Sequence, residues 1–188
     1  SSGASFAQID MHINWQDYLG GSTPPYGLTN QKFRDVSAWY HLVWVWDSDD
    51  GTQADRSRIY INGNRISDYS NSRAVNSGDQ TDINNSGRDF VIGDSSVGEG
   101  KLFDGYLAET IFIDGGTEDF TANNFAETKN GVWVPKDPSS LTFGSNGFHL
   151  KYEDASNLGN DSSGNNNDFT AAGLGTDHKV LDSPTFGS

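Results

Sequence analysis

The 188-residue sequence has no cysteine and only 12 lysine and arginine residues, against 26 aspartate and glutamate residues. Without cysteine it has no disulfide, no thiolate metal site and no cysteine nucleophile. The formal net charge of −14 argues against nucleic-acid binding, because neutralising phosphates requires a cationic surface. No run of about 18 apolar residues is present, so no membrane-spanning helix is expected.

Helical patterning is also scarce. No long segment repeats apolar residues at i, i+3, i+4 and i+7 behind a capping residue. Short apolar runs instead alternate with clusters of Gly, Asn, Ser and Asp, and the 22 glycines suit the turns between them. This spacing predicts an all-β sandwich or barrel.

Seven apolar runs are predicted to be strands. The run at residues 39–46 is apolar on both faces, with Trp44 and Trp46 on one of them. Such a strand is central, or its second face is covered by another layer or subunit. Only one short helical turn is expected, over residues 120–127. The predicted strands are residues 6–14, 39–46, 58–62, 65–69, 90–93, 106–113 and 148–153.

Two of these predictions are specific enough to name single residues. Asn62 and Gly63 lie between two runs, and this pair tolerates the positive φ angles of a tight turn, so a hairpin is expected there. In the run at residues 148–153, alternation places Phe148 on the inner face and His149 on the outer face.

Four short motifs follow one another in a fixed order through the middle of the chain. They are FRDVSAWYHLV from Phe33, RIYING from Arg58, FVIG from Phe90 and FDGYLAE from Phe103. This order resembles the laminin-G-like, concanavalin-A-like jelly-roll superfamily. The resemblance implies a two-sheet antiparallel jelly-roll sandwich.

A narrower resemblance extends toward the end of the chain. Residues 131–136, 143–150, 161–169 and 182–185 are similar to the C-terminal half of large lectin-like proteins of tailed bacteriophages. The resemblance implies a virion surface or extracellular location, in a tail fibre, a tail spike or a head decoration. It also implies other virion structural proteins as partners, a homo-oligomer with a trimer favoured, and a host surface glycan as ligand.

Two features depart from the family pattern. Domains of this family have two or three strands before the one that residues 6–14 resemble, and these strands are not seen here. The segment 148–167 resembles the strand and turn that open many such domains, yet here it comes last. The sandwich is therefore expected to lack its first strands, to receive them from a partner, or to fill their place with a permuted strand.

Two parts of the chain differ in composition. Residues 1–157 contain all the predicted strands and are expected to form the lectin-like sandwich. Residues 158–188 are rich in Gly, Asn and Ser with little apolar content, and are expected to form a polar extension.

Candidate binding residues lie in two loops. Trp15 and Tyr18 stand in a polar, glycine- and proline-flanked segment, where exposed aromatic faces could stack on sugars. Asp47, Asp49 and Asp50 cluster hard oxygen ligands in one turn, which suits Ca²⁺. The alternative for the acidic cluster is a solvated turn, since Asp and Gly are also what turns need.

Catalytic residues are harder to find. Retaining glycosidases need two carboxylates about 5 Å apart. The best candidates, Asp104 and Glu109, are five residues apart and would face opposite sides of an extended chain. No Gly-x-Ser-x-Gly elbow is present. We therefore expect a non-catalytic protein, with a secreted bacterial carbohydrate-binding module as the alternative and a glycanase as a third possibility.

Overall fold

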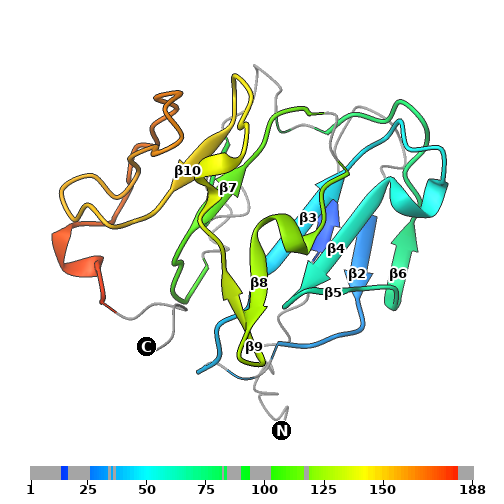
Figure 1. Ribbon diagram of the computed structural model, residues 1–188, viewed down its shortest axis with the longest axis horizontal. Coiled ribbons are helices and arrows are strands. Elements are labelled where there is room, and N and C mark those ends of the chain that lie inside the picture. The colour runs from blue at the N-terminus through cyan, green and yellow to red at the C-terminus, as the bar shows by residue number, and fades with distance from the viewer. Residues whose placement is uncertain are drawn as a thin grey trace, which may run out of the picture. The chain divides into compact units, whose positions relative to one another are not determined.

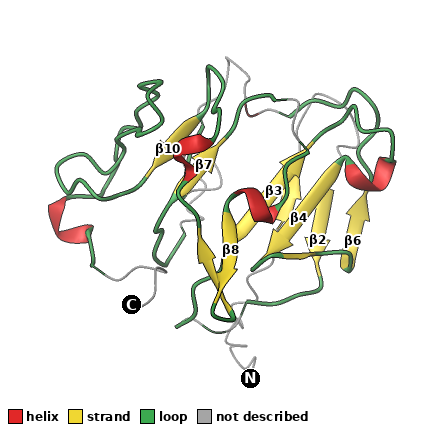
Figure 2. Cartoon of the chain, viewed as in Figure 1, coloured by secondary structure: helices red, strands yellow, loops and turns green. Residues whose placement is uncertain are grey.

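The computed structural model describes residues 14–16, 26–33, 35, 37–81, 83, 90–93, 103–116 and 119–181. Figure 2 shows that these residues form strands, loops and a few short helical turns. The strands are β1 (Asn14–Gln16), β2 (Tyr26–Thr29), β3 (Leu42–Trp46), β4 (Ser57–Ile61), β5 (Asn64–Arg65), β6 (Tyr69–Arg73), β7 (Thr110–Phe112), β8 (Ala126–Lys129), β9 (Val132–Pro135) and β10 (Phe148–Leu150). The 3₁₀ turns are η1 (Gln53–Asp55), η3 (Ala122–Asn124), η4 (Pro138–Ser140) and η5 (Thr176–His178).

The strands pair in an antiparallel fashion wherever the structure defines their register. Within the described ranges no α-helix occurs, and η3 falls inside the predicted helical turn at residues 120–127. The all-β prediction is therefore confirmed. The predicted strand at residues 6–14 lies outside the described residues, apart from Asn14 at the start of β1.

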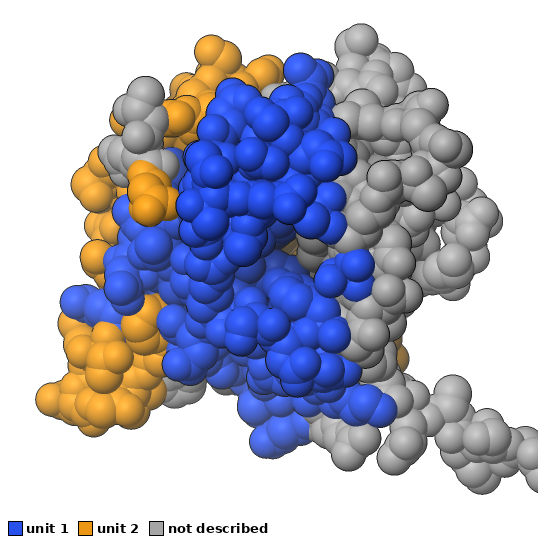
Figure 3. All heavy atoms as spheres, turned by 90° about the vertical axis from the view of Figure 1, so that its right-hand side faces the viewer, with its two compact units in different colours: residues 1–85, 120–127 blue, residues 86–119, 128–188 orange. Residues whose placement is uncertain are grey.

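The chain divides into two compact units, which Figure 3 colours separately. Unit 1 comprises residues 1–85 and 120–127, and unit 2 comprises residues 86–119 and 128–188. Each unit is thus built from two separate stretches of chain. The expected boundary between a sandwich and an extension at residue 157 stays a prediction.

Unit 1 contains two three-stranded sheets, with strand orders β1-β2-β6 and β3-β4-β5 (Figure 1). Asn62 and Gly63 join β4 to β5 with φ angles of 46° and 83°, so the predicted hairpin is confirmed. The second strand of this hairpin is only two residues long. The chain then leaves the sheet and enters β6, which pairs with β2. Buried Phe33, Ile59 and Ile61 form the core, covered by Tyr40, Ile66 and Tyr69.

The strand β3 has one buried and one exposed face in the single chain. Leu42 and Trp44 are 51% and 38% exposed, whereas Val43 between them is buried. Within the described residues β3 lies at the end of the order β3-β4-β5, so it is not a central strand there. Coverage of the face that bears Leu42 and Trp44 by another layer or subunit stays a prediction. The Trp44 indole N–H donates to the Ser57 hydroxyl at 3.1 Å.

Unit 2 is built around the antiparallel pair β7–β10, drawn in green and yellow in Figure 1. The Phe112 and Phe148 rings belong to this pair, and Phe90 and Phe169 pack onto them with ring centroids 4.8–6.0 Å apart. Edge-to-face contacts of this kind add stability beyond the buried area. This phenylalanine cluster brings together residues from four distant segments.

Two predicted strands of unit 2 are shorter than expected or missing. Residues 90–93 do not form a strand, because Phe90 joins the phenylalanine cluster and Gly93 has a φ of 88°, outside the range of a strand. Of the predicted strand at residues 106–113, only β7 is regular. This is because β10 offers a partner to three of its residues alone, while Tyr106 and Leu107 are exposed.

The strand β10 also differs from its prediction. It ends at Leu150 rather than residue 153, and Tyr152 takes a left-handed φ of 54° that turns the chain away. His149 was expected on the outer face, but it is only 4% exposed. The expected exposure is wrong because the His149 ring stacks on Phe143 and pairs with the Glu109 carboxylate.

Candidate functional site

A shallow polar depression of about 380 Å³ lies on unit 1. It lies where β2 ends, β5 ends and β6 begins. Its lining therefore comes from two stretches of chain that the β2–β6 pairing brings together. The lining residues are Asn30, Gln31, Arg65, Ile66, Ser67 and Asp68.

An irregularity in the β2–β6 pairing places Asn30 opposite Asp68. The register shifts between Leu28 and Thr29, and the Asn30 backbone N–H then donates to the Asp68 carbonyl at 3.2 Å. The Asn30 side-chain amide also donates to the Asp68 carboxylate at 2.6 Å. Buried Thr29 holds the Gln31 backbone in place, since its hydroxyl donates to the Gln31 carbonyl at 3.1 Å.

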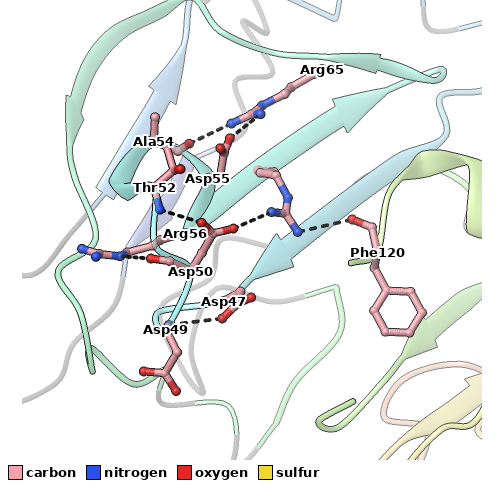
Figure 4. A network of polar contacts seen from close by, with 10 residues as sticks. Asp47, Asp49, Asp50, Thr52, Ala54, Asp55, Arg56, Arg65 and Phe120 are labelled. Atoms are coloured by element: carbon pink, nitrogen blue, oxygen red, sulfur yellow. Dashed lines mark hydrogen bonds and ion pairs between the residues drawn. The ribbon is translucent and has the colours of Figure 1, made fainter. Parts of the chain in front are cut away.

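The other wall of the depression is held by the core and by η1. The Ile66 backbone N–H donates to the Ile59 carbonyl at 2.8 Å, and the Ile66 side chain packs on the core. Figure 4 shows the Arg65 guanidinium held by two partners. Its Nη1 lies 2.6 Å from the Asp55 carboxylate, and its Nη2 donates to the Ala54 carbonyl at 2.8 Å.

Several polar atoms of the lining have no hydrogen-bond partner among the described residues. They are the side-chain amide of Gln31, the Oδ1 atom of Asn30, the hydroxyl of Ser67 and the Oδ2 atom of Asp68. Together they offer both donors and acceptors around one shallow surface. This arrangement can bind a ligand that carries many hydroxyl groups.

One family model matches residues 5–115, more than half of the chain, and it describes the concanavalin A-like lectin/glucanases superfamily. The chain belongs to this superfamily. No curated protein and no solved structure matches it significantly. The predicted two-sheet jelly-roll class agrees with this membership and with the antiparallel strands of the structure. Among the described residues, no helix is both long and apolar enough to cross a bilayer.

The depression on this concanavalin A-like domain lies inside the matched range, yet its residues were not among those that the sequence singled out. Asn30 and Asp68 are 38 residues apart, and each is ordinary for a loop next to a strand. Only the strand pairing brings them together. The predicted glycan-binding residues, Trp15 and Tyr18, stay predictions: Trp15 lies opposite Gly27 in β1, but its side chain and all of Tyr18 lie outside the described residues.

The predicted calcium ligands of the domain lie in the turn after β3. The Asp47 carboxylate accepts the Asp49 backbone N–H at 3.1 Å, and the Asp50 carboxylate accepts the Thr52 backbone N–H at 2.7 Å. Figure 4 shows the Asp49 carboxylate directed away from the other two. The described residues contain no group of three or more acidic or His side chains arranged to hold a metal ion. A calcium site at this turn stays a prediction.

The Asp50 carboxylate has a second partner in the core of unit 1. Its Oδ2 atom lies 3.3 Å from Nη1 of Arg58, which is buried. The Nη2 atom of Arg58 donates to the Phe120 carbonyl at 3.5 Å (Figure 4). Arg58 therefore connects the acidic turn to the stretch 120–127, and the turn has a structural role in this unit.

The two candidate catalytic carboxylates of the domain have different surroundings. Asp104 is exposed, whereas the Glu109 carboxylate pairs with Nε2 of buried His149. The His149 ring stacks on Phe143 with centroids 6.0 Å apart. Sequence reasoning missed this pair because alternation placed His149 on the solvent face.

Proposed function

We propose that this concanavalin A-like domain is a non-catalytic, glycan-recognising part of a virion surface protein of a tailed bacteriophage. The observation that carries the proposal is the polar depression on unit 1, where donors and acceptors surround one shallow surface. The superfamily contains lectins as well as glucanases. Sugar binding is thus a function that this fold can host, although fold alone does not determine function.

The physical fit is between a ligand rich in hydroxyls and a site rich in exposed amides and a carboxylate. Hydroxyls both donate and accept, so they can satisfy the Gln31 amide and the Asp68 carboxylate at the same time. Such exposed hydrogen bonds contribute modest energy each. We therefore expect weak binding to one sugar and stronger binding through several copies of the domain.

The proposed virion location rests on the resemblance of residues 131–136, 143–150, 161–169 and 182–185 to phage lectin-like proteins. A homo-oligomer, with a trimer favoured, provides the several copies that weak glycan binding requires. Other virion structural proteins are the expected partners, and a host surface glycan is the expected ligand. The surplus of 26 acidic over 12 basic residues keeps such a displayed domain soluble.

A glycan array probed with the full chain tests the proposed binding. We expect binding to a subset of glycans, which Asn30→Ala and Asp68→Ala each reduce. Asp49→Ala is the matched control, since it removes an exposed carboxylate of unit 1 outside the depression. An array without any bound glycan would contradict the lectin-like function.

Two further measurements separate the alternatives. Incubation with a polysaccharide panel should release no reducing ends, and release would identify a glucanase instead. Mass spectrometry of purified particles of the phage that encodes the chain should detect it. Detection only in the culture medium of a bacterium would favour the secreted carbohydrate-binding module.

A further inference from the structure

We infer that the depression on unit 1 selects non-acidic glycans and binds positively charged amino sugars best, with Asp68 as the residue that makes the selection. This inference rests on the proposed glycan binding and adds the class of ligand. It follows from how the charges around the depression are paired.

Arg65 is the one cation among the described residues of the lining, and it already has protein partners. Arg65 contacts the Asp55 carboxylate at 2.6 Å and the Ala54 carbonyl at 2.8 Å. A ligand carboxylate that binds Arg65 must therefore compete with a carboxylate that the fold holds in place. Recognition of acidic sugars commonly uses an arginine that offers two parallel N–H groups to the ligand, and here two N–H groups are engaged by the protein.

Asp68 supplies the one carboxylate among the described residues of the lining, and only one of its two oxygens accepts a hydrogen bond from them. Oδ1 of Asp68 accepts the Asn30 amide at 2.6 Å, while Oδ2 accepts no hydrogen bond from any residue that the structure describes. Asp68 is exposed, so its charge is hydrated in the unliganded domain. An ammonium group of a sugar can donate to Oδ2 and form a charge-assisted hydrogen bond, which is stronger than a neutral one.

The electrostatic field of the negatively charged chain also favours cationic over acidic ligands. With Arg65 paired to Asp55, the depression has an excess of negative charge from Asp68, and the whole chain carries −14. Charge of one sign raises the local concentration of ligands of the opposite sign and lowers that of like-charged ligands. A uronic acid or sialic acid brought next to Asp68 would be repelled, whereas a neutral sugar would not.

The array of the preceding section tests this when it carries neutral, amino and acidic glycans at equal density. We expect bound glycans among the neutral and amino classes, with the amino class highest and most sensitive to salt. Asp68→Asn should lower binding of a glucosamine pentamer about tenfold, the loss of one charge-assisted hydrogen bond, and leave its N-acetylated counterpart within about twofold. Asp49→Asn, with the same change of charge elsewhere on unit 1, should leave both unchanged.

The outcomes separate the inference from the proposed function. Binding to acidic glycans as strong as to neutral ones would overturn the inference and leave the lectin-like function intact. An equal loss for both pentamers in Asp68→Asn would also overturn it, because Asp68 would then be a general contact. An array with no bound glycan of any class would overturn the proposed function itself.

Discussion

The carboxylate of Glu109 pairs with Nε2 of His149, a buried histidine 40 residues further along the chain. The His149 backbone is held as well, because its N–H donates to the Asp161 carboxylate at 2.8 Å and its carbonyl accepts the Ser162 N–H at 2.8 Å. The imidazole ring stacks on Phe143. One residue thus joins the segment before β7, the strand β10 and the loop that follows it.

Removing Glu109 should destabilise unit 2. In Glu109→Ala the buried imidazole loses its partner, and an unsatisfied buried polar group costs about 1–3 kcal/mol. We expect a lower melting temperature and faster amide exchange at Ser162. Asp104→Ala removes an exposed carboxylate nearby in the sequence and should change neither measurement. Glu109→Gln retains an acceptor for a neutral imidazole, so recovery of stability in this variant would show that the pair does not depend on charge.

Asp161 should make unit 2 sensitive to acid. Burial alone raises the pKa of its carboxyl, but the hydrogen bonds donated by His149, Ser163 and Asn167 outweigh burial and hold the pKa below its ordinary value. A lowered pKa in the folded state means that the carboxylate stabilises the fold above the pKa of an unfolded aspartate, about 3.9. This stabilisation is lost as the pH falls through the lower folded value.

Asp161→Asn tests this dependence in thermal unfolding between about pH 2 and pH 7. We expect the variant to be less stable than the wild type at neutral pH, with a difference that shrinks as the pH falls below about 4. Asp177→Asn, at an exposed acid in the same unit, should show no such pattern. A constant difference at every pH would mean that Asp161 acts through shape rather than charge.

Two glycines of unit 2 allow a matched comparison of backbone strain and close contact. Gly144 and Gly173 have φ angles of 72° and 73°, so alanine at either position costs about 1–2 kcal/mol of backbone strain. A Cβ at Gly144 would lie 2.0 Å from the Asp114 carbonyl oxygen, whereas nothing lies within 4 Å at Gly173. Gly144→Ala should lose a further 1–3 kcal/mol, roughly the cost of overpacking. Equal melting temperatures for the two variants would contradict the close contact.

Variants of Asp50 and Asp49 in the acidic turn should distinguish a structural carboxylate from a metal ligand. Asp50→Asn weakens the partner of buried Arg58 and should lower the stability of unit 1 by about 1.5–3 kcal/mol, the range for hydrogen bonds to charged groups. Asp49→Asn should leave stability unchanged without calcium, because Asp49 is exposed. If the predicted calcium site forms, added calcium raises the wild-type melting temperature and Asp49→Asn reduces the rise. A melting temperature that calcium leaves unchanged would rule out the site.

Local signals in the sequence predict the fold best. The turn at Asn62 and Gly63 is confirmed because the positive φ angles depend on these two residues alone. The predicted strand at residues 90–93 was wrong because Phe90 packs against rings from segments far along the chain. No pattern within four residues contains that information. The predicted exposure of His149 was wrong for the same reason, since its ring pairs with Glu109, which lies 40 residues earlier in the chain.

The candidate site was less predictable than the fold. Aromatic residues in polar loops favoured Trp15 and Tyr18 as glycan-binding residues. The depression instead depends on the register shift that places Asn30 opposite Asp68. A shift of this kind changes which side chains meet, but it leaves the alternation of apolar and polar residues almost intact. Pairing information between the ends of β2 and β6 would have been needed to find it.

The division of unit 1 between residues 1–85 and 120–127 has a consequence for the order of events during synthesis. The first stretch leaves the ribosome without Ala122 and Ala126, which are both almost fully buried, and without the Phe120 carbonyl that accepts from Arg58. Residues 120–127, which complete unit 1, emerge only after residues 86–119 of the other unit. Unit 1 is therefore complete only after residue 127 has left the ribosome, with residues 86–119 of the other unit already outside.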